Sequence, residues 1–316
     1  MEYGHSGKLI EMKQQRHPGE PPSRSAHKAS APRTLLLSIL LCLFAAPFSA
    51  SARTAASCTP ISGLFRVLHA PGVFVGDMHG TAQSPAFVRA LICHVLKSGR
   101  TVLLALEYPR DQQHFLHCFL HSSSPDPERA LLASPFWSRP TQDGRTSHAM
   151  LQLLNWIRRQ IAGGARVRVV AFGWEPPRKL TGTARFNARD GRMASNLRQE
   201  LASVTPGDFP IIFTGNVHAR KTKGLPFLNA PPGAANAKPL GYRLRHLPYL
   251  HLNIVHDGGS IWACYGTCGL HHFGKPGPAV STFSIRASSD PAYDLDYFVG
   301  PISASPPAVA GHTRGE

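Results

Sequence analysis

The chain has 316 residues, of which 42% are hydrophobic and 16% are charged, so it can bury a large core and is not disordered throughout. Lys and Arg exceed Asp and Glu by 16, and there are 17 histidines. A basic balance by itself does not choose between nucleic acid, an anionic membrane and an acidic substrate. The basic residues are scattered with no run of five, however, and this argues against nucleic-acid binding.

Residues 1–52 are interpreted as a polar leader that ends in a secretory signal peptide. Basic residues precede the apolar stretch Thr34–Phe48, and small residues follow it. The apolar stretch is shorter than the roughly 20 residues of a membrane-spanning helix. We therefore predict cleavage near Ala52 and a periplasmic or secreted protein. The alternative is an uncleaved N-terminal anchor.

Five cysteines follow the leader, namely Cys58, Cys93, Cys118, Cys264 and Cys268. An exported protein tolerates disulfides, and an odd number of cysteines leaves one thiol over. Cys264 and Cys268 have no second cysteine pair beside them, so we favour a disulfide, local or to a distant partner, over a structural zinc site. Residues 55–58 weakly resemble a lipidation site, and a lipidated Cys58 would be another route to a membrane.

The remaining chain alternates short apolar segments with amphipathic ones. This pattern predicts one α/β domain over residues 53–305, with a largely parallel sheet flanked by helices, and a disordered tail over 306–316. The expected strands are 72–75, 101–106, 167–172, 210–214 and 295–299. The expected helices are 85–98, 111–121, 147–162 and 187–203, with long loops at 122–146 and 221–240. Residues 249–255 and 260–264 flank Asp257-Gly-Gly and are predicted to pair as a β-hairpin.

Polar side chains follow the first four of these strands at the point where each strand ends. His79 and His218 stand in the tetrapeptides Gly-Asp-Met-His and Gly-Asn-Val-His, while Glu107 and Glu175 end two other strands. The carboxyl ends of parallel strands form the edge at which α/β proteins bind ligands. We expect these side chains to meet there, with each histidine as a general base or a metal ligand. The alternative is that each histidine only holds its own loop.

Other polar residues lie close to the same strand ends. Arg110 is the nearest candidate partner for Glu107, either as a structural ion pair or as an anion-binding group. Substrate binding is assigned to Asp77, Glu175, Arg189, Asp190 and Asn216. For Asp190 the alternative is capping of a helix, and for Asp143 or Ser147 capping is preferred. Gly-x-Ser-x-Gly and a glycine-rich phosphate loop are both absent from the sequence.

Four short motifs in this order resemble one superfamily. They are Val-Gly-Asp-Met-His79-Gly-Thr, Leu-Glu107-Tyr-Pro-Arg110, Arg189-Asp190-x-x-Met193-Ala and Thr-Gly-Asn-Val-His218-Ala-Arg. Over about residues 70–305 the chain resembles the erythromycin esterase, ChaN-like and Tiki–TraB superfamily. The resemblance implies a duplicated α/β fold whose active crevice is lined by His79, Glu107, Arg110 and His218.

Members of this superfamily differ in what they do. The esterases open a macrolide lactone with a histidine base, Tiki-type members are metal-dependent peptidases, and ChaN-like lipoproteins bind haem. This chain is shorter than the esterases and lacks a convincing ChaN-type lipidation site.

The leading hypothesis is an exported hydrolase of an ester or amide in a small molecule or peptide. His79 would activate water, Glu107 would fix its tautomer, and His218 or Arg110 would stabilise the oxyanion. In a metal-dependent version, His79, Glu107 and His218 would hold a divalent ion such as Mn, Co or Zn. The alternative is a protein that binds haem or another anionic ligand without catalysis.

Overall fold

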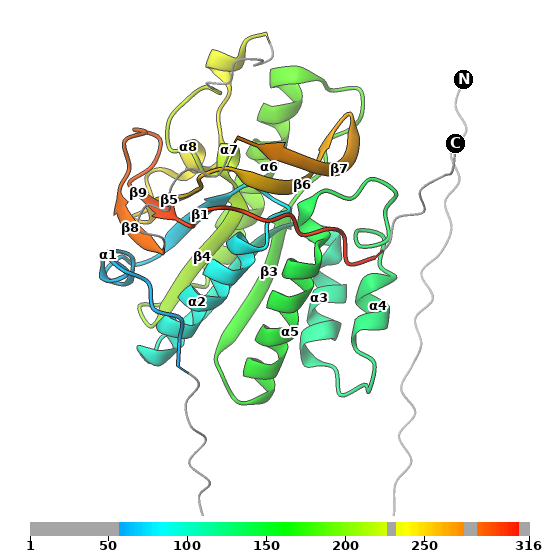
Figure 1. Cartoon of the computed structure of the whole chain (residues 1–316), viewed down its shortest axis with the longest axis vertical. Coiled ribbons are helices and arrows are strands. Elements are labelled where there is room, and N and C mark those ends of the chain that lie inside the picture. Colours follow the sequence, from blue (N-terminus) through cyan, green and yellow to red (C-terminus); the bar gives the residue numbers. More distant parts are fainter. Residues whose placement is uncertain (1–56, 226–231, 275–282, 310–316) are drawn as a thin grey trace, which may run out of the picture. The chain divides into compact units, whose positions relative to one another are not determined.

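The computed structural model describes residues 57–225, 232–274 and 283–309 (Figure 1). The predicted signal peptide and its cleavage point lie outside these residues. None of the described helices is long and apolar enough to cross a membrane.

A seven-stranded sheet runs through the centre of the domain in the order β3-β2-β4-β1-β5-β9-β8. Its strands are β1 (Val73–Asp77), β2 (Thr101–Pro109), β3 (Val167–Gly173), β4 (Asp208–Gly215), β5 (Leu250–Val255), β8 (Ser284–Ala287) and β9 (Leu295–Phe298). Neighbouring strands are parallel except β8, which is antiparallel to β9. The predicted α/β class with a largely parallel sheet is confirmed.

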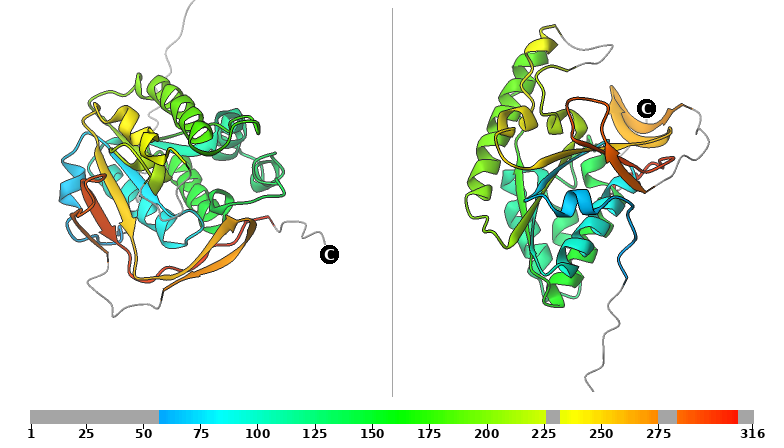
Figure 2. Two further views of the ribbon diagram at one scale, coloured as in Figure 1. Left: turned by 90° about the horizontal axis from the view of Figure 1, so that it is seen from above. Right: turned by 90° about the vertical axis from the view of Figure 1, so that its left-hand side faces the viewer.

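Helices cover both faces of this sheet (Figures 1 and 2). One face carries α2 (Gln83–Lys97), α3 (Gln113–His121) and α5 (His148–Ala162), with the short α1 (Phe65–Leu68) and α4 (Glu128–Leu132) nearby. The other face carries α6 (Gly182–Leu201), α7 (Asn216–Ala219) and α8 (Leu240–Leu244). Short 3₁₀ turns occur at Arg110–Gln112, Gly144–Thr146 and Ala234–Asn236.

The two-sided burial explains why the strands are apolar without alternation. In β1, Val73 and Val75 pack toward α2, whereas Phe74 between them packs with residues of α6 and α8. All three are fully buried, and burying each such side chain stabilises the fold by about 1.5–3 kcal/mol.

The predicted hairpin of residues 249–255 with 260–264 is wrong. β5 lies inside the large sheet, parallel to both β1 and β9. The hairpin is formed instead by β6 (Gly259–Tyr265) and β7 (Thr267–Phe273), which turn at Gly266. Two glycines with positive φ, Gly258 and Gly259, take the chain out of the sheet between β5 and β6.

Two other boundaries differ from the prediction. α6 begins at Gly182 rather than Asn187, so Asp190 lies inside the helix and does not cap it. The loop predicted at 122–146 contains α4. Capping by Asp143 and Ser147 is confirmed, since their side chains accept from the backbone N–H groups of Arg145 and Met150.

Residues 301–309 run back across the domain beside β6 (Figure 2). Isolated bridges join Ile302 to Gly259, Ala304 to Thr81 and Pro307 to Ser147. The segment keeps backbone contacts with the domain as far as Ala308, whose N–H donates to the Thr146 carbonyl.

Within the described residues there are two disulfides, Cys58–Cys93 and Cys264–Cys268, and Cys118 is exposed and free. The local pair and the single leftover thiol agree with the sequence analysis. Lipidation of Cys58 is incompatible with its disulfide.

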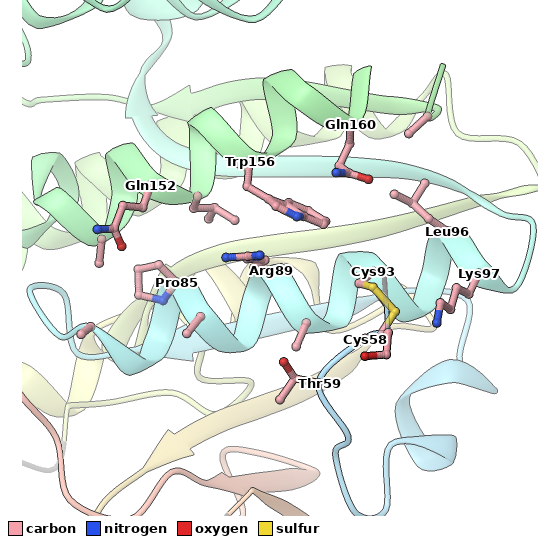
Figure 3. Close-up of a pocket in the computed structure, with 17 residues that line it drawn as sticks. Cys58, Thr59, Pro85, Arg89, Cys93, Leu96, Lys97, Gln152, Trp156 and Gln160 are labelled. Carbon is pink, nitrogen blue, oxygen red and sulfur yellow. A yellow bond between two sulfur atoms is a disulfide. The ribbon is translucent and has the colours of Figure 1, made fainter. Parts of the chain in front are cut away.

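A cavity of about 520 Å³ lies between α2 and α5 (Figure 3). The Cys58–Cys93 disulfide lies at one end, and the guanidinium of Arg89 sits over the Trp156 ring at 5.4 Å. None of the predicted site residues lines this cavity.

Candidate active site

The register of three strands brings the polar motifs together. β1 and β4 pair with Asp77 opposite Gly215, and β2 and β4 pair with Leu106 opposite Phe213. Glu107 therefore emerges beside Thr214 and Gly215, between the segment that carries His79 and the short helix α7 that carries His218.

His79 is held by the carboxylate that ends its own strand. Asp77 Oδ1 lies 2.9 Å from His79 Nδ1, and Asp77 is 3% exposed. His79 Nε2 faces Glu107, whose Oε2 is 3.4 Å away. Because a carboxylate only accepts, this arrangement places a proton on Nδ1.

The charge state of His79 follows from its two carboxylate neighbours. Burial opposes protonation of the ring, but Asp77 and then Glu107 outweigh burial and raise the pKa of His79 to about 10. Burial also raises the pKa of Asp77. At neutral pH His79 is therefore positively charged, with a proton on each ring nitrogen.

His218 has the same kind of support from a different element. Its Nδ1 lies 2.8 Å and 2.9 Å from the two carboxylate oxygens of Asp190 on α6. Asp190 is fully buried and also accepts the backbone N–H of Leu240 at 2.7 Å. Phe186 stacks on the imidazole with ring centroids 5.2 Å apart. These contacts fix the ring and turn Nε2 toward Glu107 Oε1, 3.8 Å away.

Glu107 is the carboxylate that both imidazoles face. Its Oε2 accepts hydrogen bonds from the Thr214 hydroxyl and from the Gly215 N–H, and its Oε1 accepts from Arg189 Nη2 at 2.7 Å. Burial opposes ionisation, but His218, Arg189 and His79 hold the pKa of Glu107 well below its usual range. The carboxylate is therefore ionised.

Arg145 supplies a second guanidinium at Glu107. It is 9% exposed and its Nη1 donates to the Glu107 carbonyl at 3.2 Å. Asp143 lies 2.7 Å from Arg145 Nη2, and despite burial it raises the pKa of the guanidinium. Glu175, which is 46% exposed, bridges Arg145 and Arg189 at 3.2 Å and 3.4 Å.

The loop of residues 142–147, which carries Arg145, lies against the segment that follows His79, because Gly144 has no side chain. A Cβ on Gly144 would lie 1.7 Å from the backbone nitrogen of Gly80, the residue after His79. Gly80 in turn has φ +87° and accepts the N–H groups of Trp262 and Ser305 through its carbonyl. Glycine at positions 80 and 144 allows the Arg145 loop, β6 and the C-terminal segment around Ser305 to pack against the backbone that follows His79.

The site opens into a cavity of about 570 Å³. Its polar wall carries the histidines, Glu107, Asp77, Asp143, Arg145, Arg189 and Asn216. The opposite wall is β6, which contributes Ile261, Trp262, Ala263, Cys264 and Tyr265. The indole N–H of Trp262 donates to the Gln142 carbonyl at 2.9 Å. This bond attaches the β6–β7 hairpin to the loop of residues 142–147 that carries Arg145.

No family model and no curated protein matches the sequence. Solved structures do match. An erythromycin esterase mutant in its open conformation aligns with a TM-score of 0.50 and 12% identity, over 77% of this chain and 78% of the esterase. A succinoglycan biosynthesis protein aligns with a TM-score of 0.57 and 9% identity, over 77% of this chain and 91% of that protein. The ChaN of Campylobacter jejuni, described with cofacial haem, aligns with a TM-score of 0.40 and 13% identity, over 67% of this chain and 91% of ChaN.

The chain has the erythromycin esterase-like fold. At these identities the likeness concerns the fold, which is the one that the motifs around His79 and His218 indicated.

Most of the predicted site residues are brought together in the structure. His79, Glu107, His218, Asp77, Arg189 and Asn216 line one cavity. Asp77 contacts Nδ1 of His79, and Asp190 contacts Nδ1 of His218. Glu175 lies behind the two arginines and is outside the lining.

The prediction that Arg110 partners Glu107 is wrong. Arg110 points toward α6, where it donates to the side chains of Asn196, Gln199 and Glu200. Arg189 and Arg145 take its place at Glu107. The carboxylate that contacts Nδ1 of His79 is likewise Asp77 and not Glu107.

Arg145 and Thr214 were not anticipated. Arg145 lies 38 residues beyond Glu107 in a stretch assigned to helix capping. The only local signal was an arginine directly after Gly144. Thr214, the last residue of the predicted strand 210–214, could have been found from the parallel register.

The residues as arranged do not fit a divalent ion. Both oxygens of Glu107 already accept hydrogen bonds, and Arg189 and Arg145 place positive charge within 3.5 Å of Oε1. Within the described ranges, no three His, Cys, Asp or Glu side chains are grouped to hold a metal.

Proposed function

We propose that the chain is a hydrolase that transfers an acyl group to water, with an ester as substrate. The observation that supports this is the convergence of two Asp–His pairs, one at the end of β1 and one between α6 and α7, on one ionised glutamate at the wall of a 570 Å³ cavity. If each histidine only held its own loop in place, there would be no need for both Asp–His pairs to meet beside a cavity.

The raised pKa of His79 reverses the roles expected from the sequence. A ring that is already protonated at neutral pH cannot accept a proton from water, so His79 acts as the acid. His218 acts as the base in its neutral form, in which Asp190 holds the Nδ1–H and Nε2 is left as an acceptor.

In the reaction, the oxygen of a water attacks the acyl carbon while His218 Nε2 takes the proton of that water. The negative charge that develops on the carbonyl oxygen is stabilised by His79 and by Arg145. The bond between the acyl carbon and the leaving oxygen then breaks, and His79 donates its proton to that oxygen. Acid and alcohol leave, and exchange with solvent moves one proton from His218 back to His79.

The first experiment compares His79→Gln and His218→Gln on a panel of aryl and alkyl esters. Each variant should lose activity by roughly 10²–10⁴-fold, the usual contribution of a positioned acid or base. His246→Gln, an exposed histidine outside the cavity, is the matched control. If both site variants hydrolyse the panel as the unmodified protein does, the proposal fails.

Binding of haem or another anionic ligand is the second candidate. Tyr265 favours it, because this phenol is 62% exposed on the cavity wall and tyrosine can ligate haem iron. A Soret band that shifts on adding haemin, and that is lost in Tyr265→Phe, would support binding. An unchanged haemin spectrum would remove this candidate.

Export is proposed from the apolar stretch before Ala52 and from the two disulfides. Mass spectrometry of the secreted protein should find an N-terminus near Arg53.

A further inference from the structure

The cavity of about 520 Å³ between α2 and α5 shares no lining residue with the candidate active site (Figure 3). Its volume is in the range of small-molecule sites, ~300–1,000 Å³. Residues spaced four apart line it from both helices, namely Pro85, Arg89, Cys93 and Lys97 on α2, and Gln152, Trp156 and Gln160 on α5. Because this spacing keeps side chains on one face of a helix, each helix presents one continuous stripe to the cavity.

The inner surface of the cavity is apolar. Ala90, Ala149 and Leu153 line it and are buried, and Trp156 is 9% exposed. The small alanine side chains leave the space that larger residues between two packed helices would fill. Leu96 adds apolar surface near the Cys58–Cys93 disulfide (Figure 3). A hydrocarbon group bound here would be removed from water, which favours its binding.

The charged side chains that line the cavity are cations. They are Arg89 and Lys97, and no aspartate or glutamate is among the described residues that line it. The Arg89 guanidinium lies over the Trp156 ring at 5.4 Å. Gln152 and Gln160 add amide donors without adding negative charge. The polar groups of the cavity therefore favour an anion over a cation.

Arg89 differs in this respect from the arginines of the candidate active site. Arg189 and Arg145 are both ion-paired there, with Glu107 as a shared partner. No carboxylate lies within ion-pair distance of Arg89 among the described residues. Its planar guanidinium can thus hold a ligand carboxylate through two parallel hydrogen bonds.

The length of the cavity indicates the shape of the ligand. Arg89 and Lys97 are eight residues apart on α2, which corresponds to about 12 Å along a helix axis. The lining between them includes Ala90, Cys93 and Leu96, which are apolar. A linear alkyl chain fits this space better than a compact polar anion does, because it buries apolar surface over the whole length.

We propose that this cavity binds a fatty-acid carboxylate. The carboxylate pairs with Arg89, and the alkyl chain lies along Ala90, Leu153 and Trp156 toward the disulfide. Lys97, which is exposed, adds positive charge at that end of the cavity. The site is independent of the proposed hydrolysis, since neither Arg89 nor Trp156 lines the 570 Å³ cavity.

The test is calorimetric titration of the purified full chain with dodecanoate below its critical micelle concentration. Dodecanol and dodecyltrimethylammonium carry the same chain with a neutral and a cationic head group. We expect dodecanoate to saturate at one molecule per chain and to bind at least roughly tenfold more tightly than dodecanol, since a hydrogen bond to a charged group contributes about that factor. The cationic amphiphile should bind more weakly than dodecanol.

Three variants locate the site. Arg89→Gln should remove the preference for dodecanoate and leave dodecanol binding unchanged. Ala86→Trp should weaken binding of both, because the indole would occupy the cavity that Ala86 lines. Arg66→Gln is the matched control, since Arg66 also lies over an aromatic ring, that of Phe65 at 5.5 Å, but lines neither cavity. All three positions are exposed, so the melting temperatures should stay close to that of the unmodified protein.

Three results would each overturn the proposal. The first is a lack of saturable dodecanoate binding by the unmodified protein. The second is equal affinity for dodecanoate and dodecanol, which would indicate an apolar cavity without a carboxylate site. The third is unchanged dodecanoate affinity in Arg89→Gln, which would place the carboxylate at another cation, such as the arginines of the 570 Å³ cavity.

Discussion

A Cβ atom added to Gly215 would lie 3.3 Å from Nε2 of His79. The same atom would lie 3.5 Å from His218 Cδ2 and 3.7 Å from Glu107 Oε2. Gly215 therefore borders the space enclosed by the two imidazoles and the glutamate.

The first prediction concerns this space. Gly215→Ala should lower kcat by roughly 10²-fold, because the methyl group displaces the reacting atoms by about an ångström. The backbone at Gly215, with φ −57° and ψ 144°, accepts alanine, so the melting temperature should change little. Gly207→Ala is the control, since a Cβ there meets nothing within 4 Å. Unchanged kcat in Gly215→Ala would contradict the proposed position of the substrate.

The second prediction is a pH dependence of stability. The folded-state pKa of His79, about 10, lies above its ordinary value of 6.5, so the folded protein binds more protons than the unfolded chain between these values. The stabilisation from His79 is complete below pH 6.5 and is lost as the pH rises toward 10. Melting temperatures measured from pH 6 to 10.5 should therefore fall more steeply in the unmodified protein than in His79→Gln. Parallel curves would show that the pair with Asp77 is not stabilising.

The third prediction tests the support of His218. Asp190→Asn keeps the shape of the side chain but removes the charge that holds the Nδ1–H tautomer. We expect kcat to fall by roughly 10²–10⁴-fold while the fold persists. Asp126→Asn, on an exposed loop, is the matched control. Wild-type kcat in Asp190→Asn would remove His218 from the role of base.

The fourth prediction separates two arginines. Arg145→Gln removes a cation that contacts Glu107 and Asp143, so activity should fall by roughly 10²–10³-fold and the melting temperature should also drop. Arg110→Gln should leave activity near the unmodified level, because Arg110 contacts only α6 side chains. Equal losses in the two variants would contradict the placement of Arg145 in the site.

The fifth prediction contrasts the disulfides. Cys58–Cys93 closes a loop of 35 residues and Cys264–Cys268 one of 4, which correspond to about 4 and about 2 kcal/mol of chain-entropy stabilisation. Replacing the first pair with serines should lower the melting temperature more. Replacing the second should mainly raise KM, because Cys264 lies on the cavity wall formed by β6. A KM change in the first variant and none in the second would be the opposite of this expectation.

The sequence predicts well the strands and the position of both histidines just beyond strand ends, because buried parallel strands are unbroken apolar segments that end at polar residues. It predicts poorly which side chains pair with each other when the two residues are far apart along the chain. Arg110 is three residues from Glu107, yet α6 binds it, while Arg145 reaches Glu107 from a loop seated by Gly144 on Gly80.

Local turn signals misled the prediction in a similar way. Asp257-Gly-Gly is typical of a hairpin, but the parallel neighbours of β5 satisfy its hydrogen bonds within the large sheet. The role of Asp190 was missed because the helix start was placed five residues late. Once α6 begins at Gly182, Asp190 faces inward and meets His218.

The bridges that Ile302, Ala304 and Pro307 make tie together three segments that stand far apart in the chain. They connect Gly259 at the start of β6, Thr81 shortly after His79, and Ser147 at the start of α5. A truncation after residue 300 would keep every predicted catalytic residue and remove all three connections.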